Sequence, residues 1–146
     1  MTRDYFLRVE VPYLLRDLDS HAKPIWGSMS AYQMLDHLRI AFDISIMGLK
    51  TDILTPVDKI PAFQAFLQTD RLFVKGAAMP EMFSQVSPIV DAEWEELKLR
   101  FIESLTKALH FLDDNEDYKA AHPNFGLLNA NQWKDMHQKH IKHHFT

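Results

Sequence analysis

The stretch ANQWKDMHQKHIKHH, residues 130–144, decides how the chain is interpreted, because it predicts a helix rich in histidine. Asn129 is a good N-cap and Gln132 stands at the third helical position, a pattern typical of a helix start. Residues four apart share one face of a helix, as His140 and His144 do. Two imidazoles at that spacing can reach one ion at about 2.0–2.1 Å, so the stretch predicts half of a metal site.

The spacing leaves alternatives open among these histidines. His137 lies one turn before His140 and shares its face, whereas His143 points about 60° away by helical rotation. A solvated histidine-rich helix is the competing interpretation, and an added purification tag is another. The histidines alternate with Gln, Lys and Ile and follow a helix cap, which does not fit a tag.

A second helix is predicted over residues 31–49, with Ser30 and Gln33 forming the S-x-x-Q capping box. His37 lies within its apolar stripe. A single histidine in such a stretch is often a hydrogen-bonded core residue. Helix bundles also build metal sites from facing helices, and His37 with a pair on the last helix would supply three nitrogen ligands. Three protein ligands leave one position for water or substrate.

The remaining pattern predicts an all-α fold, a four-helix bundle forming one domain over residues 1–146. Only 4 glycines occur and no strand-like alternation runs for long. Residues 50–80 are the least defined part, and RLFVKGAAMPE (71–81) is expected to be a loop covering one end of the bundle. The predicted helices are residues 9–20, 31–49, 91–112 and 130–146, with a short one at 62–67 and a break at Pro24 and Gly27.

Composition excludes several classes of protein. With no cysteine, the chain of 146 residues has no disulfide, thiolate metal site or cysteine nucleophile. The net charge is -4 and no run of Lys or Arg exceeds two residues, so we expect no nucleic-acid partner. No signal peptide or membrane-length apolar run is visible, and we expect a cytoplasmic protein without a membrane partner.

The segments PIWGSMSAYQMLDHL (24–38) and HPNFGLLNANQWKDMHQKHIKHH (122–144) together resemble the DinB-like superfamily, in particular its uncharacterised branch. That branch has a W-G-x-M…Q-M-x-x-H-L element early and an F-G…W…K-H-x-x-H-H element at the end. The two segments cover about a quarter of the chain, in the family's order. The resemblance implies a DinB-like four-helix bundle holding nickel, zinc or a similar divalent ion. Its ligands would be His37, His140 and His144.

The resemblance also implies candidate chemistry. Some relatives are thiol-dependent transferases or isomerases, so a small-molecule substrate and a low-molecular-weight thiol are the expected partners of a metal-dependent thiol transferase or hydrolase. The alternative is a non-catalytic helical binding or stress-response module, metal-stabilised or metal-free, and a homodimer is compatible with either. No general base stands out from the residues near His37, which are Asp36 and Gln33 beside it and Trp26, Tyr32 and Trp133 as candidates to line the entrance.

Relatives generally continue several residues beyond the last histidine, whereas this sequence stops at Phe145-Thr146. His144 is therefore expected in a fraying last turn, with His137 or His143 as the replacement ligand. His21, His110 and His122 are expected to be structural, the first and last of them in loops.

Overall fold

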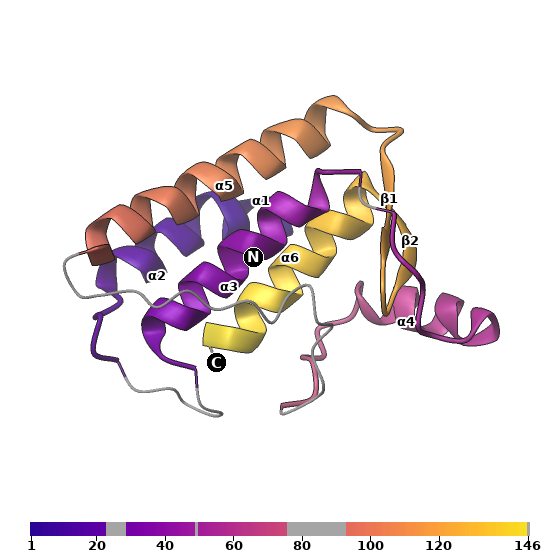
Figure 1. Cartoon of the computed structure of the whole chain (residues 1–146), viewed down its shortest axis with the longest axis horizontal. Coiled ribbons are helices and arrows are strands. Elements are labelled where there is room, and N and C mark those ends of the chain that lie inside the picture. Colours follow the sequence, from indigo (N-terminus) through magenta and orange to yellow (C-terminus); the bar gives the residue numbers. More distant parts are fainter. Residues whose placement is uncertain (23–28, 49, 76–92, 146) are drawn as a thin grey trace.

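The computed structural model describes residues 1–22, 29–48, 50–75 and 93–145, and this part of the chain is mainly helical (Figure 1). The chain opens with a helical run made of α1 (Arg3–Tyr5), a π-helical turn η1 (Phe6–Glu10) and α2 (Val11–Asp17). The Thr2 hydroxyl accepts a hydrogen bond from the Tyr5 amide and caps the start of this run. The run begins and ends earlier than the helix predicted over residues 9–20.

Helix α3 (Ala31–Ser45) begins at the predicted capping box. The Gln33 amide donates to the Ser30 hydroxyl at 3.1 Å, and the Ser30 amide donates to the Gln33 side chain at 3.0 Å. The helix ends before the predicted residue 49. There the Tyr118 hydroxyl donates to the Ser45 carbonyl and accepts from the Gly48 amide, which satisfies polar groups at the end of the helix.

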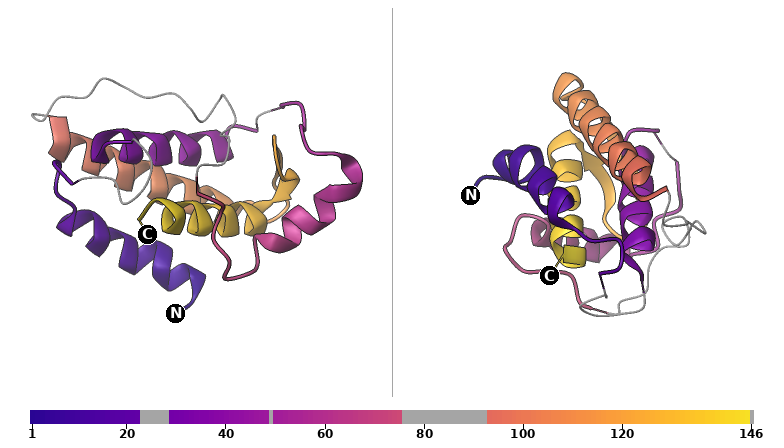
Figure 2. Two further views of the ribbon diagram at one scale, coloured as in Figure 1. Left: turned by 90° about the horizontal axis from the view of Figure 1, so that it is seen from below. Right: turned by 90° about the vertical axis from the view of Figure 1, so that its left-hand side faces the viewer.

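Helices α5 (Trp94–Asp114) and α6 (Ala130–Phe145) complete the helical core with α3. Figure 2 shows the N-terminal run lying beside α6 and α5. Arg3 pairs with Asp135 of α6 at 2.8 Å, and Arg8 pairs with Asp113 of α5. The core between these elements is apolar and fully buried, with Leu7, Val11, Leu35, Leu38, Phe42, Phe101 and Ile141 among its members.

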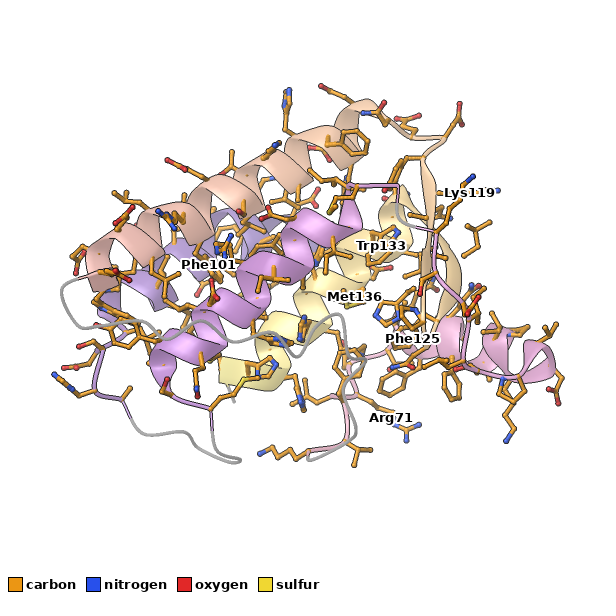
Figure 3. All side chains as sticks on the ribbon, viewed as in Figure 1. Arg71, Phe101, Lys119, Phe125, Trp133 and Met136 are labelled. Atoms are coloured by element: carbon orange, nitrogen blue, oxygen red, sulfur yellow. The ribbon has the colours of Figure 1, made fainter. Side chains whose placement is uncertain are left out.

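A second buried cluster lies where α6 meets an antiparallel hairpin, β1 (Lys119–His122) with β2 (Gly126–Asn129). Figure 3 labels Phe125, Trp133 and Met136 of this cluster, and Phe101 of the first. Next to the hairpin lie a 3-10 turn η2 (Val57–Lys59) and α4 (Ile60–Phe66), which corresponds to the short helix predicted at 62–67. The second cluster joins the hairpin to the helical core.

The prediction of an all-α, DinB-like four-helix bundle is wrong, because the described residues contain this two-stranded sheet in addition to the helices. The hairpin forms because Gly126 adopts φ +74°, a left-handed conformation that suits glycine. The Gln64 side chain of α4 donates to the carbonyls of Phe125 and Leu127, at 3.0 Å each. Because these contacts come from a segment some sixty residues away, no local sequence pattern predicts them.

Some sequence predictions concern positions beyond the described ranges. These are the break at Pro24 and Gly27, the predicted start of the third helix at Asp91 and the last residues of the RLFVKGAAMPE loop. A search of the described helices for a stretch that could cross a membrane finds none with the necessary length and apolarity.

Candidate metal centre

The structure brings His37, His140 and His144 together, so that one ligand nitrogen from each lies within 4.8 Å of the other two. The Nε2 atoms of His37 and His140 are 2.8 Å apart. The three rings contact one another with centroid distances of 4.7 Å for His37–His140 and 4.9 Å for each of the other pairs. Three histidines in this arrangement could hold a metal ion.

The antiparallel packing of α3 and α6 produces this cluster. His37 of α3 faces His140 and His144, whereas Ser45, eight residues later on α3, faces His137, which is earlier on α6. His140 and His144 lie on one face of α6 because their spacing is one helical turn. Figure 1 shows the two helices side by side and running in opposite directions.

The last turn of α6 is helical through Phe145, whose side chain packs against the core. His144 therefore lies within the helix as the structure describes it. His37 is buried, with 1% of its surface exposed, while His140 and His144 are partly exposed. One buried ligand and two partly exposed ligands give a centre that is closed on its inner side.

Burial keeps two of the three imidazoles neutral. Desolvation lowers the pKa of His144 to about 3, with further lowering by His37 and His143. Desolvation, followed by the neighbouring histidines, also lowers the pKa of His140 well below its ordinary value. A neutral imidazole carries the free lone pair that a metal ion needs. These two side chains are therefore ready to act as ligands at neutral pH.

The donor set also fits a divalent transition metal. Two nitrogens that bind one tetrahedral ion at about 2.0–2.1 Å stand roughly 3.3 Å apart, so the 2.8 Å between His37 and His140 would widen by about half an ångström. The group contains three imidazoles and no carboxylate. Imidazole suits zinc, nickel, copper and iron, whereas magnesium and calcium prefer oxygen ligands.

His137 has another role than the reserve ligand predicted for it. Its side chain has no exposed surface, and its Nε2 lies 2.8 Å from the hydroxyl of Ser45, which is also fully buried. Desolvation, then the influence of His122, lowers its pKa to about 3. His137 is thus a neutral core histidine that joins α6 to α3.

His143, the other reserve ligand, also lies outside the three-histidine group. Its ring packs edge-on against Phe73 with a centroid distance of 5.6 Å. The pKa of His143 is lowered, mainly by burial and then by the charge of Lys75, and a hydrogen bond with the Phe73 backbone offsets part of this lowering. Lys139 attaches the same loop to α6 by donating to the carbonyls of Thr69 and Arg71. Residues 69–73 thus pack along α6 beside the ligand-bearing turns.

The side chains proposed to surround His37 are mostly engaged elsewhere. Asp36 is buried and pairs with Arg39 at 2.6 Å, and Gln33 belongs to the capping box of α3. Tyr32 packs edge-on against Trp94 in the core. Trp133 is buried among the residues that join α6 to the hairpin, so it does not line an entrance. Trp26 lies outside the described residues.

The other three histidines are not part of the candidate site. His110 is exposed and contacts Asp114 at 3.1 Å, and His21 is exposed in the turn after α2. His122 was expected in a loop but ends strand β1, where it is 4% exposed and contacts the rings of Phe125 and Trp133.

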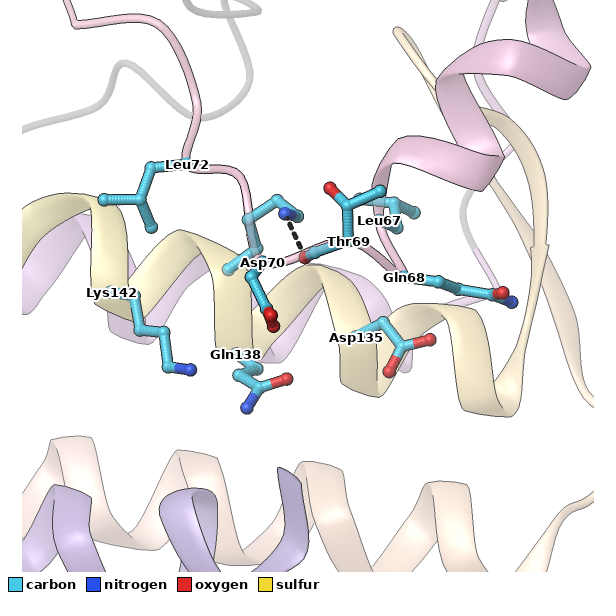
Figure 4. A pocket seen from close by; sticks show the side chains of 9 residues that line it. Leu67, Gln68, Thr69, Asp70, Leu72, Asp135, Gln138 and Lys142 are labelled. Atoms are coloured by element: carbon cyan, nitrogen blue, oxygen red, sulfur yellow. Dashed lines mark hydrogen bonds between the residues drawn. The ribbon is translucent and has the colours of Figure 1, made fainter. Parts of the chain in front are cut away.

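A pocket lies between α6 and the segment that follows α4, on a different face of α6 from His140 and His144 (Figure 4). None of the three candidate ligands lines it, so the pocket and the metal centre are separate features. Its lining residues are Leu67, Gln68, Thr69, Asp70, Leu72, Asp135, Gln138, Lys139 and Lys142.

Ser45, the partner of His137, is a residue that sequence reasoning missed. Its position eight residues after His37 places it on a similar face of the helix. That placement was the available signal, since a hydroxyl on a buried face needs a hydrogen-bond partner. The partner, His137, could not be identified without knowing how α6 packs.

Comparison with known proteins identifies a family without assigning a function. No curated protein and no solved structure matches the chain significantly. The resemblance to the DinB-like superfamily therefore stays a prediction. A family model described as a protein of unknown function, DUF1569, matches residues 11–146. The match spans nearly the whole sequence, and the chain belongs to the DUF1569 family.

Proposed function

We propose that this protein binds one divalent metal ion through His37, His140 and His144, with nickel or zinc as the expected metal. The observation that carries the proposal is the convergence of three ligand nitrogens from two helices within 4.8 Å. The low pKa values of His140 and His144 support it, since both side chains are neutral and able to donate a lone pair. A three-histidine site leaves a coordination position for water or a small molecule.

Metal analysis of untagged protein tests this proposal. We expect one equivalent of metal per chain after loading with zinc or nickel and removal of the excess. His37→Ala and His140→Ala should each reduce the occupancy to roughly a tenth or less, because each removes one of three ligands. His110→Ala is the control, since it removes an exposed histidine that lies outside the three-histidine group. Absence of stoichiometric metal in the wild-type protein would refute the proposal.

The chemistry that we propose for this centre is that of a metal-dependent enzyme, a thiol transferase or a hydrolase, acting on a small molecule. A bound ion would supply Lewis acidity, or would lower the pKa of a bound water or thiol toward neutrality. The histidines would hold the ion and leave the partly exposed side of the site for the substrate. The resemblance to the DinB-like superfamily is the basis for naming a low-molecular-weight thiol as a candidate partner.

A second candidate is a non-catalytic helical module stabilised by the metal, alone or as a homodimer. It is favoured by the state of the polar residues beside His37: Asp36 is paired with Arg39, and Gln33 caps α3. Neither is available as a general base. Assays of metal-loaded protein with a panel of electrophiles, with and without low-molecular-weight thiols, separate the two candidates. Turnover that His140→Ala abolishes supports the enzyme, and metal-dependent stabilisation without turnover supports the module.

A further inference from the structure

We propose that Ser45 and His137 are positioning residues for the metal centre, because the hydrogen bond between them sets the register of the two helices that carry the ligands. The inference rests on the proposed metal-binding function. It concerns residues that are not ligands themselves, since neither belongs to the three-histidine group.

The bond joins the two helices inside the core. The His137 Nε2 and the Ser45 Oγ are 2.8 Å apart, and neither side chain has any exposed surface. The ring of Phe42, one turn before Ser45, packs edge-on against His137 with a centroid distance of 5.1 Å. The orientation of the His137 ring is therefore restricted by the hydrogen bond at its Nε2 and by the Phe42 ring packed against it.

Proton accounting favours one direction for the bond. The Ser45 hydroxyl has one proton and donates it to the Phe42 carbonyl at 2.7 Å. In this arrangement the His137 Nε2 carries the proton and donates it to Ser45. Loss of the Ser45 hydroxyl would leave a buried N–H donor without its acceptor, which costs more than the loss of an exposed hydrogen bond.

The bond matters for the metal because the ligands come from both helices. His37 lies two turns before Ser45 on α3, and His140 and His144 lie one and two turns after His137 on α6. A slip of one residue along a helix displaces the ligands by about 1.5 Å. A metal site tolerates about 0.2 Å in its ligand distances. A directional bond on the same helix faces opposes such a slip.

The test compares two variants that each remove one hydroxyl. Ser45→Ala removes the proposed register bond. Thr55→Val is the matched control, because the Thr55 hydroxyl also donates to a backbone carbonyl at 2.7 Å, that of Asn124, but does not join α3 to α6. Zinc affinity is measured by competition with a chromophoric chelator, and the visible spectrum of the cobalt-loaded protein reports the ligand geometry.

We expect Ser45→Ala to bind zinc about 10-fold more weakly, because the buried His137 N–H loses its acceptor and the two ligand-bearing helices lose their register bond, and to shift the cobalt absorption bands. Thr55→Val should retain the wild-type affinity and spectrum. His137→Gln is the second variant, and it covers the case in which Ser45→Ala does not fold. Glutamine keeps an N–H donor within reach of Ser45, so His137→Gln should bind zinc more tightly than His137→Leu.

Three results would overturn the inference. Ser45→Ala could bind zinc with wild-type affinity and spectrum, or Thr55→Val could weaken binding as much as Ser45→Ala does. His137→Gln and His137→Leu could also bind equally. In all three cases the wild-type protein still binds zinc, and the proposed function stands. A wild-type protein that binds no zinc contradicts the proposed function, and this inference fails with it.

Discussion

Acidification should destabilise the fold through His122, a neutral histidine buried in the hairpin. Its Nδ1 accepts a hydrogen bond from the Asn124 amide at 3.0 Å, so a proton on that nitrogen would face an N–H donor. Burial lowers its pKa from 6.5 to about 3. A histidine whose pKa is lower in the folded than in the unfolded chain stabilises the fold fully above the unfolded pKa, here 6.5. This contribution to the free energy of unfolding is lost as the pH falls from 6.5 toward 3.

The magnitude follows from these two pKa values. Between pH 7 and pH 5 the unfolded chain takes up about 0.7 proton at this position, while the folded chain takes up almost none. The free energy of unfolding should then fall by about 2 kcal/mol from His122 alone. His137, whose pKa is also lowered to about 3, adds a loss of similar size.

Urea denaturation at pH 7, 6 and 5 measures this, with a chelator present so that metal binding does not contribute. His122→Asn is the comparison, because asparagine can accept from the Asn124 amide but does not titrate. It should be less stable at pH 7 by about 2–3 kcal/mol, because it loses the ring contacts with Phe125 and Trp133. Its stability should fall by about 2 kcal/mol less than that of the wild type between pH 7 and pH 5. Parallel pH profiles for the two proteins would refute the reasoning.

Two further predictions concern local structure, and both are measured as free energies of unfolding in urea. Gly126→Ala should destabilise the protein by about 2 kcal/mol or more, because φ is +74° and a Cβ would lie 3.1 Å from Ile60; Gly48→Ala, at φ +65° with open space, should cost only about 1 kcal/mol. Equal costs would show that contact with Ile60 does not restrict the hairpin. Asn129→Ala should cost about 1 kcal/mol, since Asn129 accepts from the Gln132 amide at 2.8 Å at the start of α6. An unchanged stability would mean that this cap does not stabilise the helix.

The starts of α3 and α6 could be predicted because their signals are local. Ser30 with Gln33 and Asn129 with Gln132 each satisfy backbone groups within one turn, and both pairs form as expected. The end of α3 was predicted too late, because it depends on Tyr118, more than seventy residues away. Local chemistry can therefore be inferred from sequence more safely than contacts between distant segments.

The hairpin shows the same limit. Its strands have four residues each, and their sequences, KAAH and GLLN, do not alternate between apolar and polar residues. It is hydrogen-bonded to distant segments by the Gln64 side chain and by the Leu54 amide, which donates to the Pro123 carbonyl. Both partners lie in the stretch that the sequence defined least. The four-helix bundle was therefore the wrong architecture although most of the helices were expected.

Residue spacing predicts one part of the candidate site, the pair on α6, whereas the other part depends on how α3 packs against α6. His140 and His144 are one helical turn apart, and their shared face needed no tertiary information. The choice between His144 and His137 could not be made from spacing, because both share a face with His140. Ser45 decides it by engaging His137 from the facing helix.

The location of a bound metal tests the central claim most directly. Anomalous diffraction from crystals of zinc-loaded protein should show one strong peak per chain at about 2.0–2.1 Å from the Nε2 atoms of His37 and His140 and from a ring nitrogen of His144. The His137 Nε2 should remain bonded to Ser45 in the same crystals. A peak at His110 and Asp114, a peak that includes His137 as a ligand, or no peak at all would contradict a metal centre built on His37, His140 and His144.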